Sequence, residues 1–246
     1  MTEEGFDPAA FETLAGLEER HFWFRARNRL ICSELQRDFP DARSMLEVGC
    51  GTGFVLRGIA ACRPDLSLTG TDLYADGLEF ARRRVDARID QMDARSIPFE
   101  GEFDLIGAFD VIEHIPEDGT ALREMHKALR PGGGLMLTVP QHRWLWSEFD
   151  ELSHHQRRYM RAELVGKVRA AGFSVRRVTS FVSLLLPAIA LERLRPGGER
   201  SLEEHLTVPA WMNRAFESMM SLELALIRRG VSLPAGGSLL LSAVRD

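Results

Sequence analysis

The chain has 246 residues, of which 45% are hydrophobic, and this is enough to bury one sizeable core in a single domain. Its 31 Lys and Arg residues are outnumbered by 36 Asp and Glu residues, which gives a formal net charge of −5. A dedicated nucleic-acid-binding protein normally carries a basic stripe, so we expect no nucleic-acid partner.

The cysteine and hydropathy patterns favour a cytoplasmic protein. Cys32, Cys50 and Cys62 lack C-x-x-C spacing, so neither a disulfide framework nor a zinc site is indicated. The acidic N-terminus lacks the charged and then apolar pattern of a signal peptide. No apolar run approaches the ~20 residues that span a bilayer.

Residues 1–43 are expected to form an N-terminal helical cap. Apolar spacing predicts helices over residues 9–19 and 25–37, and Asp7-Pro8 is typical of a helix start. The stretch E-R-H-F-W-F-R between them is aromatic and basic. We expect its rings either to anchor the helices on a sheet or to form a lid over a ligand.

The next stretch predicts a strand, a glycine-rich turn and a helix. Residues 44–48 form a short apolar run, residues 54–62 read as a helix, and Gly49, Gly51 and Gly53 lie between them. Such a turn lets a ligand approach the backbone and its outward-pointing amides. Phe54 stands where the dinucleotide fingerprint needs Gly or Ala, and no P-loop lysine follows.

The E-x-G-x-G-x-G pattern of Glu47, Gly49, Gly51 and Gly53 resembles motif I of the class I methyltransferases, which bind S-adenosylmethionine (SAM). The resemblance implies that these four residues contact SAM. The R-x-x-x-I spacing of Arg27 and Ile31 resembles the quinone-pathway O-methyltransferases, in which such an arginine holds the SAM carboxylate. We therefore favour Arg27 over its neighbours Arg25 and Arg29 for this role.

Acidic residues at the ends of the next two strands suit an adenosine ligand. Asp72 ends a strand over residues 66–72 and is expected to accept hydrogen bonds from the ribose hydroxyls. A capping role for a helix over residues 75–85 is the compatible alternative. We expect Leu73 to lie against the adenine, and Asp93 and Ala94 to contact its amino group and ring nitrogen.

Further strand and helix repeats complete an α/β sheet. Residues 103–109 and 135–139 read as strands around a helix over residues 120–129, and Asp110 follows the first strand, where ligands bind in open α/β sheets. The repeats predict a parallel sheet with helices on both faces. The resemblance implies a seven-stranded, mostly parallel sheet of order 3-2-1-4-5-7-6, with strand 7 antiparallel.

The connection over residues 141–159 carries the candidate catalytic residues. A loop that leaves a strand at its carboxyl end should border the reactive methyl group. If the acceptor is a hydroxyl, His154 or His155 is the expected general base because imidazole titrates near neutrality. His142 and then His114 are the next candidates.

Two other interpretations of this connection stay open. Its arginines and Glu163 could form surface ion pairs, which contribute only ~0–1 kcal/mol each. His142, His154 and His155 could instead bind a metal ion. We expect no metal, because neighbouring histidines in a loop have no set ligand spacing.

The last part of the chain is expected to contain a helical insertion. Residues 161–171 and 173–178 read as a helix and a strand, and residues 238–244 as a closing strand, so residues 179–237 form an insertion over the substrate side. Basic residues border its apolar stretches, which suits helices that lie in a membrane interface. We expect either peripheral contact with the inner membrane face through residues 181–229 or packing on the sheet or in a homodimer.

The resemblance implies SAM-dependent methyl transfer to a hydroxyl or amine of a small-molecule or lipid-linked acceptor, with O-methylation favoured over N-methylation. The passage H-H-x-R-R-Y-x-x-x-E-L at residues 154–164 is similar to methyltransferases of quinone and lipid-linked glycan pathways. A SAM-binding scaffold without catalysis is the main alternative. A nucleotide-dependent oxidoreductase is disfavoured by Phe54.

Overall fold

The computed structural model describes residues 8–193 and 201–246. These residues contain a seven-stranded sheet of order β3-β2-β1-β4-β5-β7-β6. The strands are β1 (Ser44–Val48), β2 (Ser67–Asp72), β3 (Arg88–Gln91), β4 (Phe103–Phe109), β5 (Leu129–Pro140), β6 (Phe173–Phe181) and β7 (Ser238–Arg245). β7 pairs antiparallel with β5 and β6, and the other pairs are parallel. The expected sheet order and the antiparallel last strand are both confirmed.

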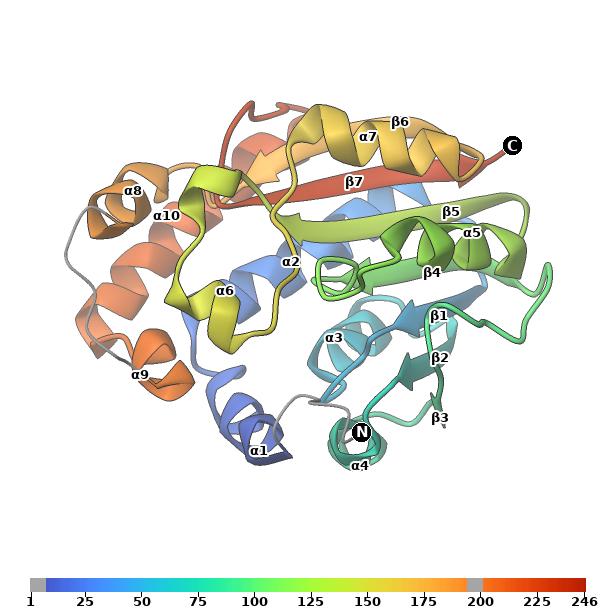
Figure 1. Cartoon of the computed structure of the whole chain (residues 1–246), viewed down its shortest axis with the longest axis horizontal. Helices are drawn as coiled ribbons and strands as arrows, with labels where there is room; N and C mark the ends of the chain where they lie inside the picture. Colours follow the sequence, from blue (N-terminus) through green and yellow to red (C-terminus); the bar gives the residue numbers. More distant parts are fainter. Residues whose placement is uncertain (1–7, 194–200) are drawn as a thin grey trace.

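Helices cover both faces of this sheet (Figure 1). One face carries α2 (Phe22–Asp38), α3 (Phe54–Cys62) and α4 (Ala75–Arg84), and α1 (Pro8–Leu17) packs beside α4. The other face carries α5 (Asp118–Ala128) and α7 (Arg161–Ala170). Because both faces are buried, the inner strands are apolar on both sides.

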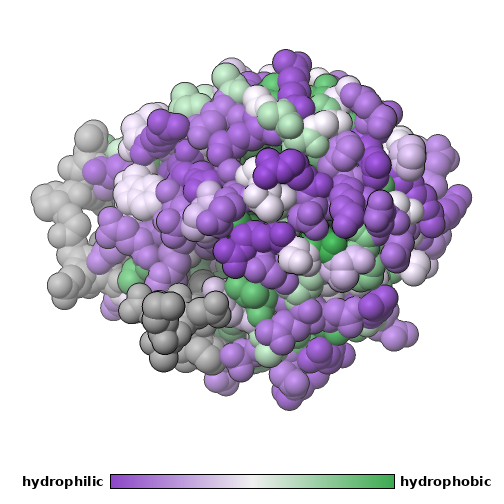
Figure 2. All heavy atoms as spheres, turned by 45° about the vertical axis from the view of Figure 1, so that its right-hand side comes forward, coloured by the Kyte–Doolittle hydropathy of each residue, from purple (hydrophilic) through white to green (hydrophobic). Residues whose placement is uncertain are grey.

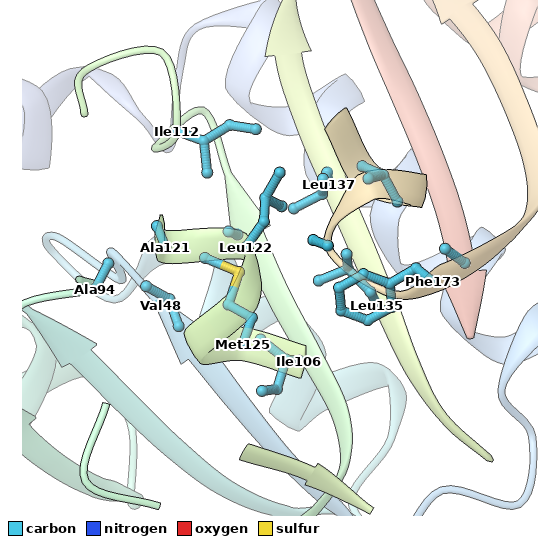
Figure 3. Close-up of a cluster of buried hydrophobic side chains, with 14 of the residues drawn as sticks. Val48, Ala94, Ile106, Ile112, Ala121, Leu122, Met125, Leu135, Leu137 and Phe173 are labelled. Carbon is cyan, nitrogen blue, oxygen red and sulfur yellow. The ribbon is translucent and has the colours of Figure 1, made fainter. Parts of the chain in front are cut away.

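The larger core cluster lies between the sheet and the pair α5 and α7. Figure 3 shows Leu122 and Met125 of α5 pointing toward side chains of the strands. Leu122, Met125, Ile106, Leu135 and Leu137 are all completely buried. This packing holds the carboxyl ends of β4 and β5 in fixed positions, and the site lies at those ends.

The remaining elements lie at the carboxyl ends of the parallel strands. After β5 the chain forms a short 3₁₀ turn (Arg143–Leu145) and α6 (Glu148–Leu152). The insertion between β6 and β7 forms α8 (Leu186–Arg193), α9 (Leu202–Leu206) and α10 (Ala210–Arg228). In Figure 1, α6, α8 and α9 lie on the side toward which β4 and β5 point. The helical insertion between the last two strands is therefore confirmed, but it does not begin at residue 179, because β6 continues to Phe181, which pairs with Ser238 of β7.

Helix α10 packs along α2 and fixes its first turn. The Asn213 side chain accepts a hydrogen bond from the Phe22 amide at 2.8 Å and donates one to the Arg20 carbonyl at 2.9 Å. Glu217 forms ion pairs with Arg25 and Arg29, each at 2.8 Å. Hydrogen bonds and ion pairs from the insertion thus hold the helix that carries Arg27 in position.

The structure corrects two expected boundaries. Helix α2 begins at Phe22 rather than at Arg25, because the Nδ1 of His21 accepts from the Trp23 amide at 3.3 Å and Asn213 satisfies the Phe22 amide. The three aromatic residues therefore lie within the helix and not between two helices. Strand β5 begins at Leu129 rather than at Leu135, since Leu129 pairs with Phe103 across a register shift.

The face of the molecule in Figure 2 is mainly hydrophilic, with hydrophobic residues visible in small separated areas. Among helices of the described residues, none combines the length and the apolar character needed to cross a membrane.

Candidate active site

A cavity of about 1480 Å³ opens at the carboxyl ends of β1, β4 and β5. Its lining comes from α1 and α2, the glycine-rich turn, the 141–159 connection and the insertion. Pockets for single small ligands are usually ~300–1,000 Å³. This cavity has room for a cofactor and a second molecule.

The glycine-rich turn forms one wall of this cavity. Gly49, Gly51 and Gly53 have φ angles of +70°, +50° and +75°, which disfavour a side chain. A Cβ at Gly53 would lie 2.8 Å from the Cα of Ala81, and one at Gly49 would collide with Val111. A Cβ at Gly51 would have no atom within 4 Å. Gly49 and Gly53 are thus required by packing, whereas Gly51 borders open space.

Asp72 connects this turn to the next helix. Its Oδ2 accepts from the Gly51 amide at 2.8 Å, and its Oδ1 accepts from the Tyr74 amide at 3.0 Å. Burial raises the pKa of Asp72, and these backbone hydrogen bonds oppose the shift. Each carboxylate oxygen has a second lone pair that can accept from a ligand hydroxyl.

The residues expected around an adenine ring also line the cavity. Leu73 is 41% exposed, and Ala94 is buried. The Asp93 carboxylate is ion-paired with Arg95 at 2.7 Å, and hydrogen bonds from Arg95 lower the pKa of Asp93 against the opposing effect of burial. Asp93 can therefore offer only its remaining lone pairs to a ligand.

Arg27 is one of the α2 residues that line the cavity. Its guanidinium lies 4.5 Å from the Trp23 ring centroid and forms an ion pair with Asp110. Asp110 also accepts from the Thr138 hydroxyl at 3.0 Å. The Nε of Arg27 is buried and has no hydrogen-bond partner among the described residues, so it can still donate.

Glu47 is a buried carboxylate behind the glycine-rich turn. Its Oε2 has no hydrogen-bond partner within the described part of the chain. Burial raises the pKa of Glu47 well above its usual range, and nearby Arg27 opposes this shift. A ligand cation would supply the missing partner.

Glu18 is a site residue that sequence reasoning missed. The Thr52 hydroxyl donates to the Glu18 carboxylate at 2.7 Å, and Arg84 forms an ion pair with the same carboxylate. Arg84 also donates to the Thr52 hydroxyl at 2.7 Å. This group fastens α1 and α4 to the glycine-rich turn. No spacing within the sequence connects residues so far apart.

His155 is held in place by a buried acid. Its Nδ1 lies 2.8 Å from the Oδ1 of Asp150, which also accepts from the Nε of Arg158 at 2.7 Å. Burial would raise the pKa of Asp150, but the hydrogen bonds from His155 and Arg158 lower it. The ionised acid orients the imidazole and leaves its Nε2 available. Asp150 was not among the candidates from the sequence, although the S-x-x-D pattern of Ser147 and Asp150 could have predicted the capping box of α6.

His114 and Glu113 lie against His155. The ring centroids of His114 and His155 are 4.7 Å apart. Burial lowers the pKa of His114 to about 4, with His155 adding to the shift. Burial and the nearby Asp110 raise the pKa of the completely buried Glu113 well above its usual range. These three side chains form a polar group on the lining of the cavity.

The other histidine candidates have different positions. His154 is exposed at the cavity edge, with a φ of +56°. His142 is absent from the described residues that line the cavity, and its ring lies 5.7 Å from that of Trp144. The structure therefore brings His155 and His114 together and leaves His142 outside the cavity.

The arginines of the connection have structural partners. Arg157 pairs with Asp118 at 2.8 Å, Arg158 with Asp150 at 2.7 Å and Arg143 with Glu163 at 2.9 Å. Ion pairs thus explain these three side chains, but the pair of Arg158 with Asp150 is buried and not at the surface. They hold the connection in position beside the histidines.

Comparison with known proteins agrees with this geometry. The family described as "Methyltransferase domain" matches residues 18–178. A probable S-adenosylmethionine-dependent methyltransferase of Mycolicibacterium smegmatis is 29% identical over 166 residues, which are 66% of this chain and 63% of that protein. Ubiquinone biosynthesis O-methyltransferase of Pseudomonas paraeruginosa is 28% identical over 104 residues, which are 39% of this chain and 44% of that protein.

Solved structures share the whole architecture. The protein solved in complex with the Trm112 methyltransferase activator of Haloferax volcanii has a TM-score of 0.63 and 21% identity, covering 97% of this chain and 95% of that one. At this identity the likeness concerns the fold alone. The chain spans between 44% and 63% of the length of the two curated relatives above. The family match covers most of the chain, which therefore belongs to the methyltransferase-domain family of class I SAM-dependent proteins.

Proposed function

We propose that this chain transfers the methyl group of SAM to a hydroxyl of a small-molecule or lipid-linked acceptor. One observation carries the proposal: the glycine-rich turn with Asp72 and the oriented imidazole of His155 line the same cavity. A cofactor on one wall and an acceptor on the other would meet inside it.

The residues that would bind SAM are those on the cavity wall whose side chains can still form hydrogen bonds. The Arg27 guanidinium would hold the SAM carboxylate, and the unpartnered Glu47 oxygen would face the SAM ammonium. Asp72 would accept from the ribose hydroxyls. Leu73 would cover the adenine, with Asp93 and Ala94 at its edge. Asp110 positions Arg27 through their ion pair.

The chemistry is a direct displacement. The acceptor oxygen attacks the methyl carbon, the carbon–sulfur bond breaks, and the sulfonium becomes the neutral thioether of S-adenosylhomocysteine. Most of the acceleration would come from aligning oxygen, carbon and sulfur in a closed site. The acceptor hydroxyl must also lose its proton, and the group of Glu113, His114 and His155 is placed to promote that loss.

This polar group favours a hydroxyl over an amine. A neutral amine attacks without prior loss of a proton, so it would not need an imidazole held by a buried acid. A hydroxyl needs such assistance near neutral pH. The similarity to a ubiquinone biosynthesis O-methyltransferase also supports O-methylation.

A screen of acceptors tests the proposal. The full chain is incubated with SAM and quinol, sugar-nucleotide, lipid-linked or amine acceptors, and product is detected by mass spectrometry. We expect methylation of a hydroxyl acceptor, and a large loss of turnover with unchanged SAM affinity in His155→Gln. Asp72→Ala serves as the SAM-binding-deficient control.

Two results would contradict the proposal. Methylation of amines alone, with His155→Gln as active as the wild type, would exclude O-methylation. Tight SAM binding without methylation of any acceptor class would favour a scaffold that binds SAM without catalysis.

A further inference from the structure

We propose that Glu113, His114 and His155 bind a first-row divalent transition-metal ion at the acceptor end of the cavity. One ligand atom from each of these residues lies within 4.8 Å of the other two. All three residues line the cavity. The sequence offered only His142, His154 and His155 as an alternative metal site and predicted no metal, so these three ligands differ from that set in Glu113 and His114.

The spacing of the three atoms is close to that of a metal site. Metal bonds to imidazole nitrogen and carboxylate oxygen are about 2.0–2.2 Å long, so ligand atoms around one ion lie within about 4.3 Å of each other. The 4.8 Å limit is slightly above this maximum, which applies to ligands on opposite sides of an ion, and it exceeds the roughly 3.5 Å between tetrahedral ligands. Side-chain rotations around a bound ion would have to bring the three atoms closer together.

Glu113 is difficult to explain without a cation. It is completely buried, and within the described residues neither carboxylate oxygen has a hydrogen-bond partner. An ionised carboxylate in this state is costly unless it is paired or binds a metal. If Glu113 is protonated instead, the O–H of its carboxyl group has no hydrogen-bond acceptor. Arg27 and Arg158 lower the pKa of Glu113 through their charge, but neither donates a hydrogen bond to its carboxylate. Their ion pairs are with Asp110 and Asp150.

His155 has the supporting contact typical of a metal ligand. Its Nδ1 is held by the Asp150 carboxylate at 2.8 Å, so the Nε2 is free to coordinate. Carboxylates that bind the second nitrogen of a ligating histidine fix the orientation and basicity of its ring. The adjacent ring of His114 stands at 74° to that of His155, with 4.7 Å between centroids.

The donor set selects the class of metal. Two imidazoles and one carboxylate suit Zn²⁺, Fe²⁺ or Co²⁺ better than Mg²⁺ or Ca²⁺, which prefer oxygen ligands. Three protein ligands leave at least one coordination position open, as in catalytic metal sites. That position would face the cavity.

The consequence for methyl transfer rests on the proposed function. An acceptor hydroxyl in the open position would bind the ion and release its proton to solvent at a lowered pKa. The resulting oxyanion would attack the SAM methyl carbon as the carbon–sulfur bond breaks. His155 would then act as a metal ligand, and the ion would promote loss of the proton.

Titration with Co²⁺ alone tests the site. The full chain is freed of metal with a chelator and titrated with Co²⁺, while visible ligand-field absorption and isothermal calorimetry are recorded. We expect one Co²⁺ per chain. Glu113→Gln, His114→Gln and His155→Gln should each weaken binding at least ~10-fold, and Asp150→Asn should weaken it by ~10–100-fold. His142→Gln is the matched control, because this histidine lies in the same connection outside the cavity, and it should bind like the wild type.

The outcomes separate the metal proposal from the proposed function. Absence of stoichiometric Co²⁺ binding, or equal binding by the wild type and folded His155→Gln, would overturn the metal site. Full methylation by the chelator-treated chain would overturn the proposed role of the ion in methyl transfer and leave the methyltransferase proposal standing. Stoichiometric Co²⁺ binding without methylation of any acceptor would support the site and contradict the proposed function. Circular dichroism and SAM binding by each variant show whether it is folded.

Discussion

Arg27, in α2, and Asp110, directly after β4, form an ion pair that joins the N-terminal helices to the central strands. Both residues lie on the cavity wall. Asp110 adopts a φ of +58°, which is uncommon for a residue other than glycine. The pair holds the guanidinium beside the position expected for the SAM carboxylate.

We therefore expect Arg27→Gln to weaken SAM binding by about 10–100-fold, since hydrogen bonds to charged groups contribute roughly 1.5–3 kcal/mol. Arg25→Gln is the matched control. It lies on the same helix but pairs with Glu217 on the outside, where Arg29 also binds Glu217. Calorimetry with SAM gives the comparison, and equal affinities for the two variants would exclude a carboxylate-binding role for Arg27.

Gly51→Ala should abolish or strongly reduce SAM binding. Its new methyl group would meet no protein atom within 4 Å, so any clash must come from the ligand. Gly101 offers a close control, because it has a φ of +62° and is also free of neighbours around a Cβ. Both variants should lose about 1 kcal/mol of stability from the left-handed backbone. Only Gly51→Ala should lose SAM affinity, and a parallel loss in Gly101→Ala would point to general destabilisation.

The stability of the chain should decrease in acid partly through His21. Burial lowers the pKa of His21 to about 4, and its Nδ1 accepts from the Trp23 amide only while the ring is neutral. In the unfolded chain His21 takes up a proton near pH 6.5, so neutral His21 contributes fully to the free energy of unfolding above that pH. It is lost as the pH falls to about 4, by at most about 3 kcal/mol.

The control for this effect is His21→Asn, which keeps a capping oxygen and does not titrate. Urea unfolding of both proteins at about pH 7.5, 5.5 and 4.5 isolates the contribution, because the other ionisable groups are common to both. The wild type should lose more stability than His21→Asn over this range. Identical pH profiles would contradict the prediction.

The structure shows which residue of the insertion can be changed to test membrane binding without disturbing the fold. Leu185, Met220 and Leu224 are buried, so a charge at Leu185 would destabilise the fold. Trp211 is 70% exposed on α10. If the insertion binds membranes, the wild type should float with anionic vesicles at low salt and Trp211→Glu should not.

Trp144→Glu is the control for this experiment, since Trp144 is 55% exposed on the 141–159 connection. A wild type that ignores vesicles would leave packing as the role of the apolar residues. Sedimentation equilibrium of the same proteins would show whether the exposed face of α10 forms a homodimer.

Local sequence patterns predicted the strands and the cofactor edge of the sheet, whereas the strand order came from the family resemblance. Short apolar runs with Glu47, Asp72 and Asp110 at or near their ends mark strands, and the three glycines have positive φ angles that few other residues adopt. These features depend on neighbours along the chain. They therefore appear in the sequence without knowledge of the fold.

The acceptor side could not be predicted in the same way. The contact of His155 with His114 joins segments that are distant in sequence, and only the packed sheet brings them together. The start of α2 was misplaced because Asn213, from the far end of the chain, satisfies its first amide. Long-range partners of this kind leave no periodic pattern.

The contact of Asn213 with α2 has a consequence for communication between the two ends of the cavity. Helix α10 lines the cavity with Met212 and Phe216, and it also fixes the first turn of the helix that carries Arg27. A ligand that displaces α10 would change the reach of the guanidinium, and linkage requires the effect to be equal in both directions. We therefore expect Asn213→Ala to reduce any dependence of SAM affinity on bound acceptor or lipid, as measured by calorimetry with and without that second ligand. Binding of an acceptor or lipid near α10 would then change the affinity for SAM through the side chain of Asn213.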